Sequence, residues 1–337
     1  MPERAGIAMS PLTLSRHRHW MLIRNLTVEG VVAPLGRSDH FTVFGLSASS
    51  SDGGDDIVVV HDFLPEQVDN NIGSYVADEL LPLLARARPA ASVAADPYAY
   101  SEHEMFERYV GSIVRSIDGN ERRAWHRFYD NTLAALRAEA RLNGGSGTDF
   151  IRSFRAIYAR VETLVAEIGD ATGSVNLLDV ATCFGFLPLF LAGRDSGDGS
   201  GARRRITGCD LNPALIALAD DYRRQRDIDG VTFLHADFLA AEAEADLRAL
   251  GGTFQVVTAI HFLEHIAPED TAAAVERLWA LTGRRLIIAV PLESEPDRRF
   301  GHRQVFDRER LAALGRQTGG SCEIFEHHGG WLVADCR

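Results

Sequence analysis

The sequence predicts an α/β fold with a mostly parallel seven-stranded sheet that ends in an antiparallel hairpin, preceded by an α+β accessory domain. Two observations predict the sheet: apolar runs alternate with helical patterns through the second half, and two strand-like runs joined at Gly329 and Gly330 close the chain. Such alternation is typical of parallel sheets, and a Gly-Gly turn is typical of hairpins. The Gly- and Ser-rich stretch 143–148 separates the halves, so we expect domains at residues 1–147 and 148–337.

The first domain is expected to combine a small antiparallel sheet with several helices. Residues 20–28, 40–46 and 56–63 are rich in β-branched and aromatic types and are separated by Gly- and Ser-containing turns. Apolar residues then recur at helical spacing. This pattern predicts helices at 72–86, 102–117, 120–142 and 149–168.

In the second domain each predicted strand is short and apolar, and each predicted helix follows a strand. The predicted strands are 175–180, 206–209, 231–234, 254–260 and 285–290, and the hairpin strands are 322–327 and 331–336. The predicted helices are 187–192, 213–225, 268–281 and 307–318. Five parallel strands and a closing hairpin make up the seven-stranded sheet.

Composition excludes several classes of function. Of the 337 residues, 47 are acidic and 35 basic, and the net charge of −12 argues against a nucleic acid or an anionic membrane as the main partner. All 35 basic residues are Arg, which excludes a Schiff-base or phosphate-loop lysine. The four Cys are widely spaced, and we see neither a signal-peptide block nor an apolar run of about 20 residues. We therefore expect a cytoplasmic protein that acts on a small molecule.

Acidic residues follow three successive predicted strands. Asp179 opens a turn of small residues that ends at Gly185, and Asp210 closes the next strand. In doubly wound sheets ligands bind at these strand ends, where a carboxylate can hold both hydroxyls of a ribose. Asp210 follows Asp179 by 31 positions, more than the usual spacing of about 20, and we interpret the polar segment 194–205 as a surface insertion. Asp237 follows the third strand and can accept from an adenine amine, with Phe238 beside it.

Together these positions resemble the class I S-adenosylmethionine-dependent methyltransferases, which have a Rossmann-like fold. The resemblance covers about half of the chain. It implies that Asp179 and the turn bind the methionine part of S-adenosylmethionine, that the segment at Asp210 binds the ribose, and that Asp237 and Phe238 bind the adenine. His261, after the fourth strand, falls in the family's post-strand-four segment. The implied cofactor-binding residues are Asp179, Ala181, Cys183, Gly185, Asp210, Leu211, Asn212, Asp237, Phe238 and His261.

The turn departs from the family pattern, in which three glycines alternate after the acid. Here Ala181 and Cys183 precede the single Gly185. We expect Ala181 to be tolerated with a negative φ and Cys183 to narrow the space near the cofactor.

His261, Glu264 and His265 form the pattern H-x-x-E-H, which inverted zinc peptidases share. A zinc site of that kind needs a helix and a third ligand. The segment instead follows a strand and is soon followed by Pro268, so we expect a loop and no metal. Methyl transfer requires in-line positioning of the reactants rather than a metal.

His302 is the candidate catalytic base, because the segment after the fifth strand is where the methyl acceptor lies in the resembling family. An alcohol keeps its proton at neutral pH, and a positioned base contributes about 10²- to 10⁴-fold. The alternative is a loop histidine that is hydrogen-bonded to a carboxylate.

A narrower resemblance, carried by the DVATCFGFLP, GHRQVFD and HHGGWLVADC segments, is to the mycofactocin oligosaccharide methyltransferases of actinobacteria. It implies O-methylation of a glucose hydroxyl on a glycosylated small molecule. The first domain would then recognise the sugar, for which the candidate side chains are Trp20, Asn70, Asn71, Tyr98, Tyr100, Trp125 and Tyr129. Two alternatives stay open: a nicotinamide-dependent oxidoreductase and a non-catalytic S-adenosylmethionine-binding protein.

Overall fold

The structure is a computed structural model that describes residues 15–17, 20–24, 33–46, 56–87, 100–138, 149–193, 203–240, 243–249 and 252–336. Its chain divides into two compact units, Met1–Ile151 and Arg152–Arg337. Within the described residues, no helix has the length and hydrophobicity needed to cross a membrane.

The first unit contains a mixed five-stranded sheet. Its strands, in the order in which they lie, are β1 (Ser15–His17), β2 (Trp20–Arg24), β5 (Asp56–His61), β4 (Phe41–Leu46) and β3 (Gly36–Arg37). β4 and β5 form the expected antiparallel pair, whereas β2 runs parallel to β5. The expectation of an antiparallel sheet was therefore wrong for β2, because its neighbour in the sheet is β5, which runs in the same direction, and not β4.

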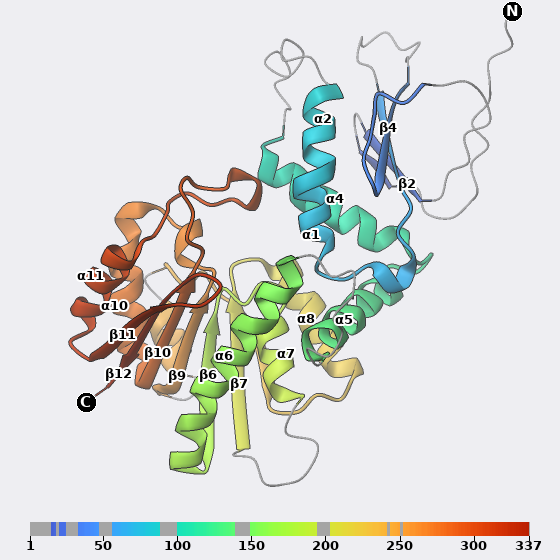
Figure 1. Ribbon diagram of the computed structural model, residues 1–337. Helices are drawn as coiled ribbons and strands as arrows, with labels where there is room; N and C mark the ends of the chain where they lie inside the picture. The colour runs from blue at the N-terminus through green and yellow to red at the C-terminus, as the bar shows by residue number, and fades with distance from the viewer. Residues whose placement is uncertain are drawn as a thin grey trace, which may run out of the picture. The chain divides into compact units, whose positions relative to one another are not determined.

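Helices complete the first unit (Figure 1). The expected helix at 72–86 is a continuous run of α1 (Ile72–Tyr75), a π-helical segment η2 (Val76–Leu80) and α2 (Leu81–Ala87). The short turn η1 (Pro65–Gln67) precedes it, and α4 (Glu102–Ser116) and α5 (Glu121–Arg137) follow. Ser101 begins α4 with a capping box to Glu104, which satisfies backbone N–H groups at the helix start.

The second unit contains the predicted seven-stranded sheet. Its strands, in the order in which they lie, are β11 (Ser321–Glu326), β12 (Gly330–Asp335), β10 (Thr282–Val290), β9 (Phe254–Ile260), β6 (Ser174–Val180), β7 (Arg203–Asp210) and β8 (Val231–His235). β12 is antiparallel to both β10 and β11, and the other pairings are parallel. The predicted fold class is confirmed. β7 begins at Arg203, so the last three residues of the expected insertion 194–205 belong to a strand; residues 194–202 lie outside the described residues.

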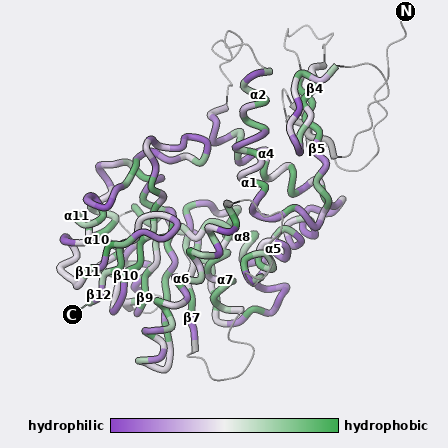
Figure 2. The backbone as a smooth tube through the Cα atoms, in the orientation of Figure 1, coloured by the Kyte–Doolittle hydropathy of each residue, from purple (hydrophilic) through white to green (hydrophobic). Residues whose placement is uncertain are grey.

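Helices lie on both faces of this sheet (Figure 1). They are α6 (Asp149–Thr172), α7 (Phe186–Ala192), α8 (Pro213–Gln225), α9 (Ala243–Ala249), α10 (Thr271–Leu281) and α11 (Arg308–Thr318), with 3₁₀ turns η3 (Leu263–His265), η4 (Pro268–Asp270) and η5 (Arg298–Phe300). The central strands carry mostly hydrophobic residues (Figure 2). On one face Leu178, Val257 and Ile288 pack against α10 and α11 in a buried cluster.

The strand order reverses at β6. β6 pairs with β7 on one side and with β9 on the other, so the connections leave in opposite directions. A crevice outside the carboxyl ends of the strands is where open α/β sheets bind ligands. The segments that follow β6, β7, β8, β9 and β10 therefore all begin at one edge of the sheet.

Candidate functional site

Asp210, at the carboxyl end of β7, holds together two of the segments at this edge. One of its carboxylate oxygens accepts from the Cys183 N–H at 2.8 Å and the other from the Asn212 N–H at 2.8 Å. The Asn212 side chain in turn caps α8 by accepting from the N–H groups of Ala214 and Leu215. The sequence-predicted residues Cys183, Asp210 and Asn212 are therefore adjacent.

Asp179 is buried, and both of its carboxylate oxygens have partners. Thr182 donates its hydroxyl to one oxygen at 2.6 Å, and Thr258, on β9, donates to the other at 2.7 Å. Burial raises the pKa of Asp179 to about 6, against the lowering effect of the two threonine hydrogen bonds. Asp179 thus fastens the β6–α7 turn to β9. Neither threonine was predicted from the sequence, although Thr182 lies inside the turn that Asp179 opens.

The turn after β6 has the positive φ angles typical of glycine, although two of its residues are not glycine. Ala181 has φ of 57°, Cys183 of 52° and Gly185 of 71°. The expectation of a negative φ at Ala181 was wrong. A left-handed conformation costs roughly 1–2 kcal/mol for a residue with a Cβ, so Ala181 and Cys183 are held in it by surrounding contacts. Those contacts include the hydrogen bonds of Thr182 N–H to Cys209 O at 2.9 Å and of Cys183 N–H to Asp210.

Exposed leucines follow β7 and β8. Leu211 is 64% exposed and Leu239 36% exposed, and both lie next to a predicted cofactor acid. Asp237 accepts from the Leu239 N–H at 3.0 Å. Phe238, which we expected beside an adenine, is instead buried in the core, where its ring meets Phe262 edge to face. The exposed large apolar side chains after β7 and β8 are therefore these two leucines.

The segment after β9 is a strained turn. His261 has φ of 54°, and its backbone N–H donates to Ala289 O of β10 at 2.8 Å. Its ring lies 5.4 Å from that of Phe154 on α6, and its Nδ1 lies 3.1 Å from Oε1 of the fully buried Glu264. The pKa of Glu264 lies below its usual value, because His261 and His265 outweigh the effect of burial. Leu263, Glu264 and His265 form a 3₁₀ turn and His261 lies outside it, so the motif is a loop, as expected, and not the helix that a zinc peptidase needs.

His302 is nearly buried and is oriented by a carboxylate. Its Nδ1 lies 2.8 Å from Oε2 of Glu293, which follows β10. The His302 backbone N–H donates to Asp297 O at 3.1 Å. A carboxylate on Nδ1 favours the tautomer that carries a proton there and leaves the Nε2 lone pair available. The pairing of Glu293 with His302 was not predicted from the sequence, although the two residues lie only nine positions apart.

Hydrogen bonds fix the His302 segment against the turn after β9. The Arg303 N–H donates to Glu264 O at 2.7 Å. The buried Gln304 side chain donates to Leu263 O at 2.6 Å and to Ile266 O at 3.1 Å. Gln304 in turn accepts from Arg310 of α11. His302 is therefore attached to the same sheet edge as the three acids.

The residues at this edge fit the adenosyl cofactor that the sequence resemblance implies. The Asp210 carboxylate lies at the strand end that suits a ribose diol. Leu211 and Leu239 offer apolar surface for a base, and Asp237 lies beside Leu239. Both carboxylates have each oxygen hydrogen-bonded, but Asp179 is buried whereas Asp210 is partly exposed. Asp179 therefore fits the role of holding the turn better than that of contacting a ligand.

Most of the sugar-recognition candidates that the structure describes in the first unit are packing residues. Asn71, Trp125 and Tyr129 are buried. Tyr98 and the side chain of Trp20 lie outside the described residues.

A family model and several solved structures are similar to this chain. Residues 177–283 match the family model described as a methyltransferase domain. Similar solved structures include magnesium protoporphyrin IX methyltransferase from Synechocystis PCC 6803 with bound SAH, at 16% identity over 64% of this chain and 97% of that one, with a TM-score of 0.43. The N-terminal domain of EvdMO1 with SAH bound is similar to the same degree, at 16% identity, 64% and 97% coverage and a TM-score of 0.43. No curated protein sequence matches the chain significantly.

The second unit thus contains an S-adenosylmethionine-dependent methyltransferase domain of class I. The expected cofactor, S-adenosylmethionine, is confirmed.

Proposed function

We propose that the protein is an O-methyltransferase that acts on a hydroxyl of a small-molecule acceptor, with His302 as the catalytic base. The observation that carries this proposal is the pairing of His302 Nδ1 with Glu293 at 2.8 Å. An imidazole held in this way presents a lone pair on Nε2 and can accept the proton of an alcohol. An amine or thiol acceptor would have less need of such a base.

The base is tied to the edge at which the cofactor-binding acids lie. Asp210 ends β7, whereas the segment that carries His302 is fixed to the turn after β9 by the Arg303 N–H and the Gln304 side chain. The carboxyl ends of parallel strands meet at one edge of a sheet, so an acceptor at His302 would approach the cofactor from the β9–β10 side. When bound, S-adenosylmethionine supplies an electrophilic methyl group on its sulfonium sulfur.

The reaction balances with the residues present. The acceptor oxygen forms a bond to the methyl carbon, the carbon–sulfur bond breaks, and its electron pair stays on the sulfur of the neutral thioether product. The hydroxyl proton passes to His302 Nε2 and then to water. Glu293 stabilises the imidazolium that forms, because its carboxylate accepts from Nδ1–H.

The acceptor we propose is a glucose hydroxyl of the mycofactocin oligosaccharide, and the first unit is proposed to recognise it. Support for this acceptor comes from the sequence resemblance. Mass spectrometry of the oligosaccharide after incubation with the protein and a labelled methyl donor tests it. We expect one labelled methyl ether on a glucose unit; an unlabelled oligosaccharide alongside a labelled amine or thiol product would contradict the proposal.

Cofactor binding is tested at Asp210. We expect Asp210→Ala to weaken S-adenosylhomocysteine binding about 10- to 100-fold, because hydrogen bonds to a charged group contribute about 1.5–3 kcal/mol. Calorimetry measures the affinity. The control is Asp246→Ala, which removes an exposed acid from α9 and should leave binding unchanged. Equal affinities of Asp210→Ala and the unaltered protein would sink the assignment.

The base is tested at His302 and Glu293. We expect His302→Ala to lower kcat about 10²- to 10⁴-fold while S-adenosylhomocysteine affinity stays within about twofold. Glu293→Gln should lower kcat less, because the ring keeps a hydrogen-bond partner at Nδ1 but loses the charge that stabilises the imidazolium formed during the reaction. Full activity of His302→Ala across the pH range would show that another group takes the proton.

A further inference from the structure

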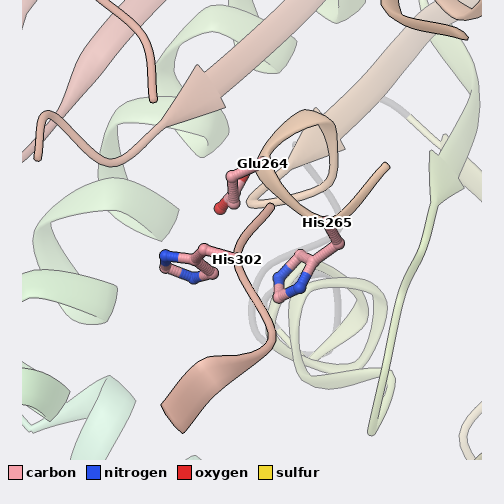
Figure 3. A group of neighbouring side chains, drawn as sticks. All are labelled: Glu264, His265 and His302. Atoms are coloured by element: carbon pink, nitrogen blue, oxygen red, sulfur yellow. The ribbon is translucent and has the colours of Figure 1, made fainter. Parts of the chain in front are cut away.

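Three potential metal ligands from two loops gather beside the proposed acceptor site. They are Glu264 and His265 on the turn after β9 and His302 on the loop after β10 (Figure 3). One ligand atom from each lies within 4.8 Å of the other two. We propose that Glu264, His265 and His302 bind a divalent transition-metal ion.

The Glu264 carboxylate points to a cation. It is fully buried, and among the described residues neither of its oxygens accepts a hydrogen bond. His261 Nδ1 lies 3.1 Å from Oε1, but the contact lacks the geometry of a hydrogen bond. Removing a carboxylate from water costs several kcal/mol unless other groups compensate for it. A cation bound between Glu264 and the two imidazoles would compensate directly.

The surroundings of His302 match those of a metal-bound histidine. Such a histidine almost always donates its second ring nitrogen to a carboxylate or carbonyl, which fixes the tautomer and the ring orientation. Glu293 is that carboxylate, at 2.8 Å from Nδ1. Arg303 N–H and the Gln304 side chain fasten the His302 loop to the backbone around Glu264. The loops that carry Glu264 and His302 are therefore held together by contacts that need no metal.

The ligand set indicates both the class of ion and its function. Two imidazoles and one carboxylate suit Zn²⁺ and its first-row neighbours, and catalytic zinc sites use three protein ligands with one position open. His265 is exposed, so the open position can be reached from solvent. Such an ion would bind the acceptor oxygen and lower the pKa of its hydroxyl, whose proton would leave to water.

This role of the ion rests on the proposed O-methyltransferase function and refines it. His302 is the base of the metal-free site; with an ion on Nε2 it becomes a ligand and the ion activates the hydroxyl. The site also differs from that of a zinc peptidase, since His302 takes the place that His261 would hold in the H-x-x-E-H pattern. The proposal replaces the sequence-based expectation of no metal.

Metal binding to the full chain tests the proposal without cofactor or acceptor. Chelator-treated protein is titrated with Zn²⁺ by calorimetry and with Co²⁺ by visible spectroscopy, whose d–d bands report direct ligation. We expect one saturable site. Loss of a residue that hydrogen-bonds to a metal ligand typically weakens metal binding 10- to 100-fold, and we expect Glu293→Gln to weaken Zn²⁺ binding by that factor. Substitution of a ligand should weaken the binding at least as much, as in Glu264→Gln, His265→Ala and His302→Ala.

Two histidines outside the cluster provide matched controls. His103→Ala removes a partly exposed His that faces Glu107 on α4. His328→Asn removes an exposed His with positive φ while keeping a residue type that tolerates it. Both should leave the affinity unchanged. Circular dichroism and the affinity for S-adenosylhomocysteine show whether each variant is folded. Because His265 is exposed, its variant remains informative even if Glu264→Gln unfolds.

Absence of a saturable site, or equal Zn²⁺ affinity in His265→Ala and the unaltered protein, would overturn the metal site. The O-methyltransferase proposal would survive that result, because the assay involves no methyl transfer. Conversely, if the protein binds the metal but methylates no hydroxyl, the metal site is supported and its catalytic role is contradicted.

Discussion

At the scale of single residues, the Asp179 carboxylate stabilises the fold through its hydrogen bonds. Its two oxygens accept from Thr182 and Thr258, and it is 3% exposed. The charged form is disfavoured by burial, so the pKa in the folded protein, about 6, lies above the unfolded value near 3.8. Between these values the folded state binds more protons than the unfolded state.

The consequence is a pH-dependent stability that Asp179→Asn should abolish. As pH rises from about 4 to about 7, the free energy of unfolding of the unaltered protein should fall relative to the variant by about 3 kcal/mol, at 1.36 kcal/mol per pKa unit. Denaturant unfolding of both proteins across this range measures the difference. Parallel pH profiles would mean that Asp179 titrates normally.

The sequence could predict which residues stand at the strand ends, but not what those residues touch. Asp179 and Asp210 were placed by the strand pattern alone. The partner Thr258 is 79 positions from Asp179 and meets it through the pairing of β6 with β9, which single-sequence patterns do not specify. The pairing of Glu293 with His302 was missed for a similar reason, since it depends on how the loop after β10 folds back.

At the scale of elements, the β6–α7 turn is shaped by what packs beneath it. Gly185 combines a φ of 71° with a crowded neighbourhood: an added Cβ would lie 2.4 Å from the Phe233 ring of β8 and 3.1 Å from Ala219 Cβ of α8. Gly173, at the end of α6, has a similar φ of 75° but nothing within 4 Å of an added Cβ. A comparison of alanine substitutions at the two glycines therefore distinguishes the cost of backbone strain from the cost of steric overlap.

We expect Gly173→Ala to lower the free energy of unfolding by about 1–2 kcal/mol, the cost of a left-handed residue with a Cβ. Gly185→Ala should cost about 1–3 kcal/mol more, because overpacking adds to the strain. It should also weaken S-adenosylhomocysteine binding, since the turn must shift. Chemical denaturation and calorimetry measure the two effects, and equal destabilisation of the two variants would contradict the packing argument.

Element prediction succeeded where hydrophobic periodicity was strong. All five parallel strands and the hairpin of the second unit occur within a few residues of the expected places. Helix α9 was missed because its short acidic sequence carries little apolar periodicity. The parallel pairing of β2 with β5 was missed because strand patterns do not encode neighbour order.

At the scale of the whole molecule, the chain divides its structure between two units, each with buried hydrophobic residues of its own. Asp210, the β6–α7 turn, Glu264 and His302 all belong to the second unit. We therefore expect a chain of residues 149–337, which begins with α6, to bind S-adenosylhomocysteine within about threefold of the full protein, because all proposed cofactor contacts are retained.

The same shortened chain should not methylate the oligosaccharide at a measurable rate, because the proposed acceptor-recognition domain is missing. Binding measured by calorimetry and turnover measured by mass spectrometry separate the two roles. If the shortened chain keeps the kcat/KM of the full protein, acceptor recognition belongs to the second unit, and the first unit has another task. If it folds but does not bind S-adenosylhomocysteine, the cofactor site is not confined to the segments that follow β6, β7 and β8.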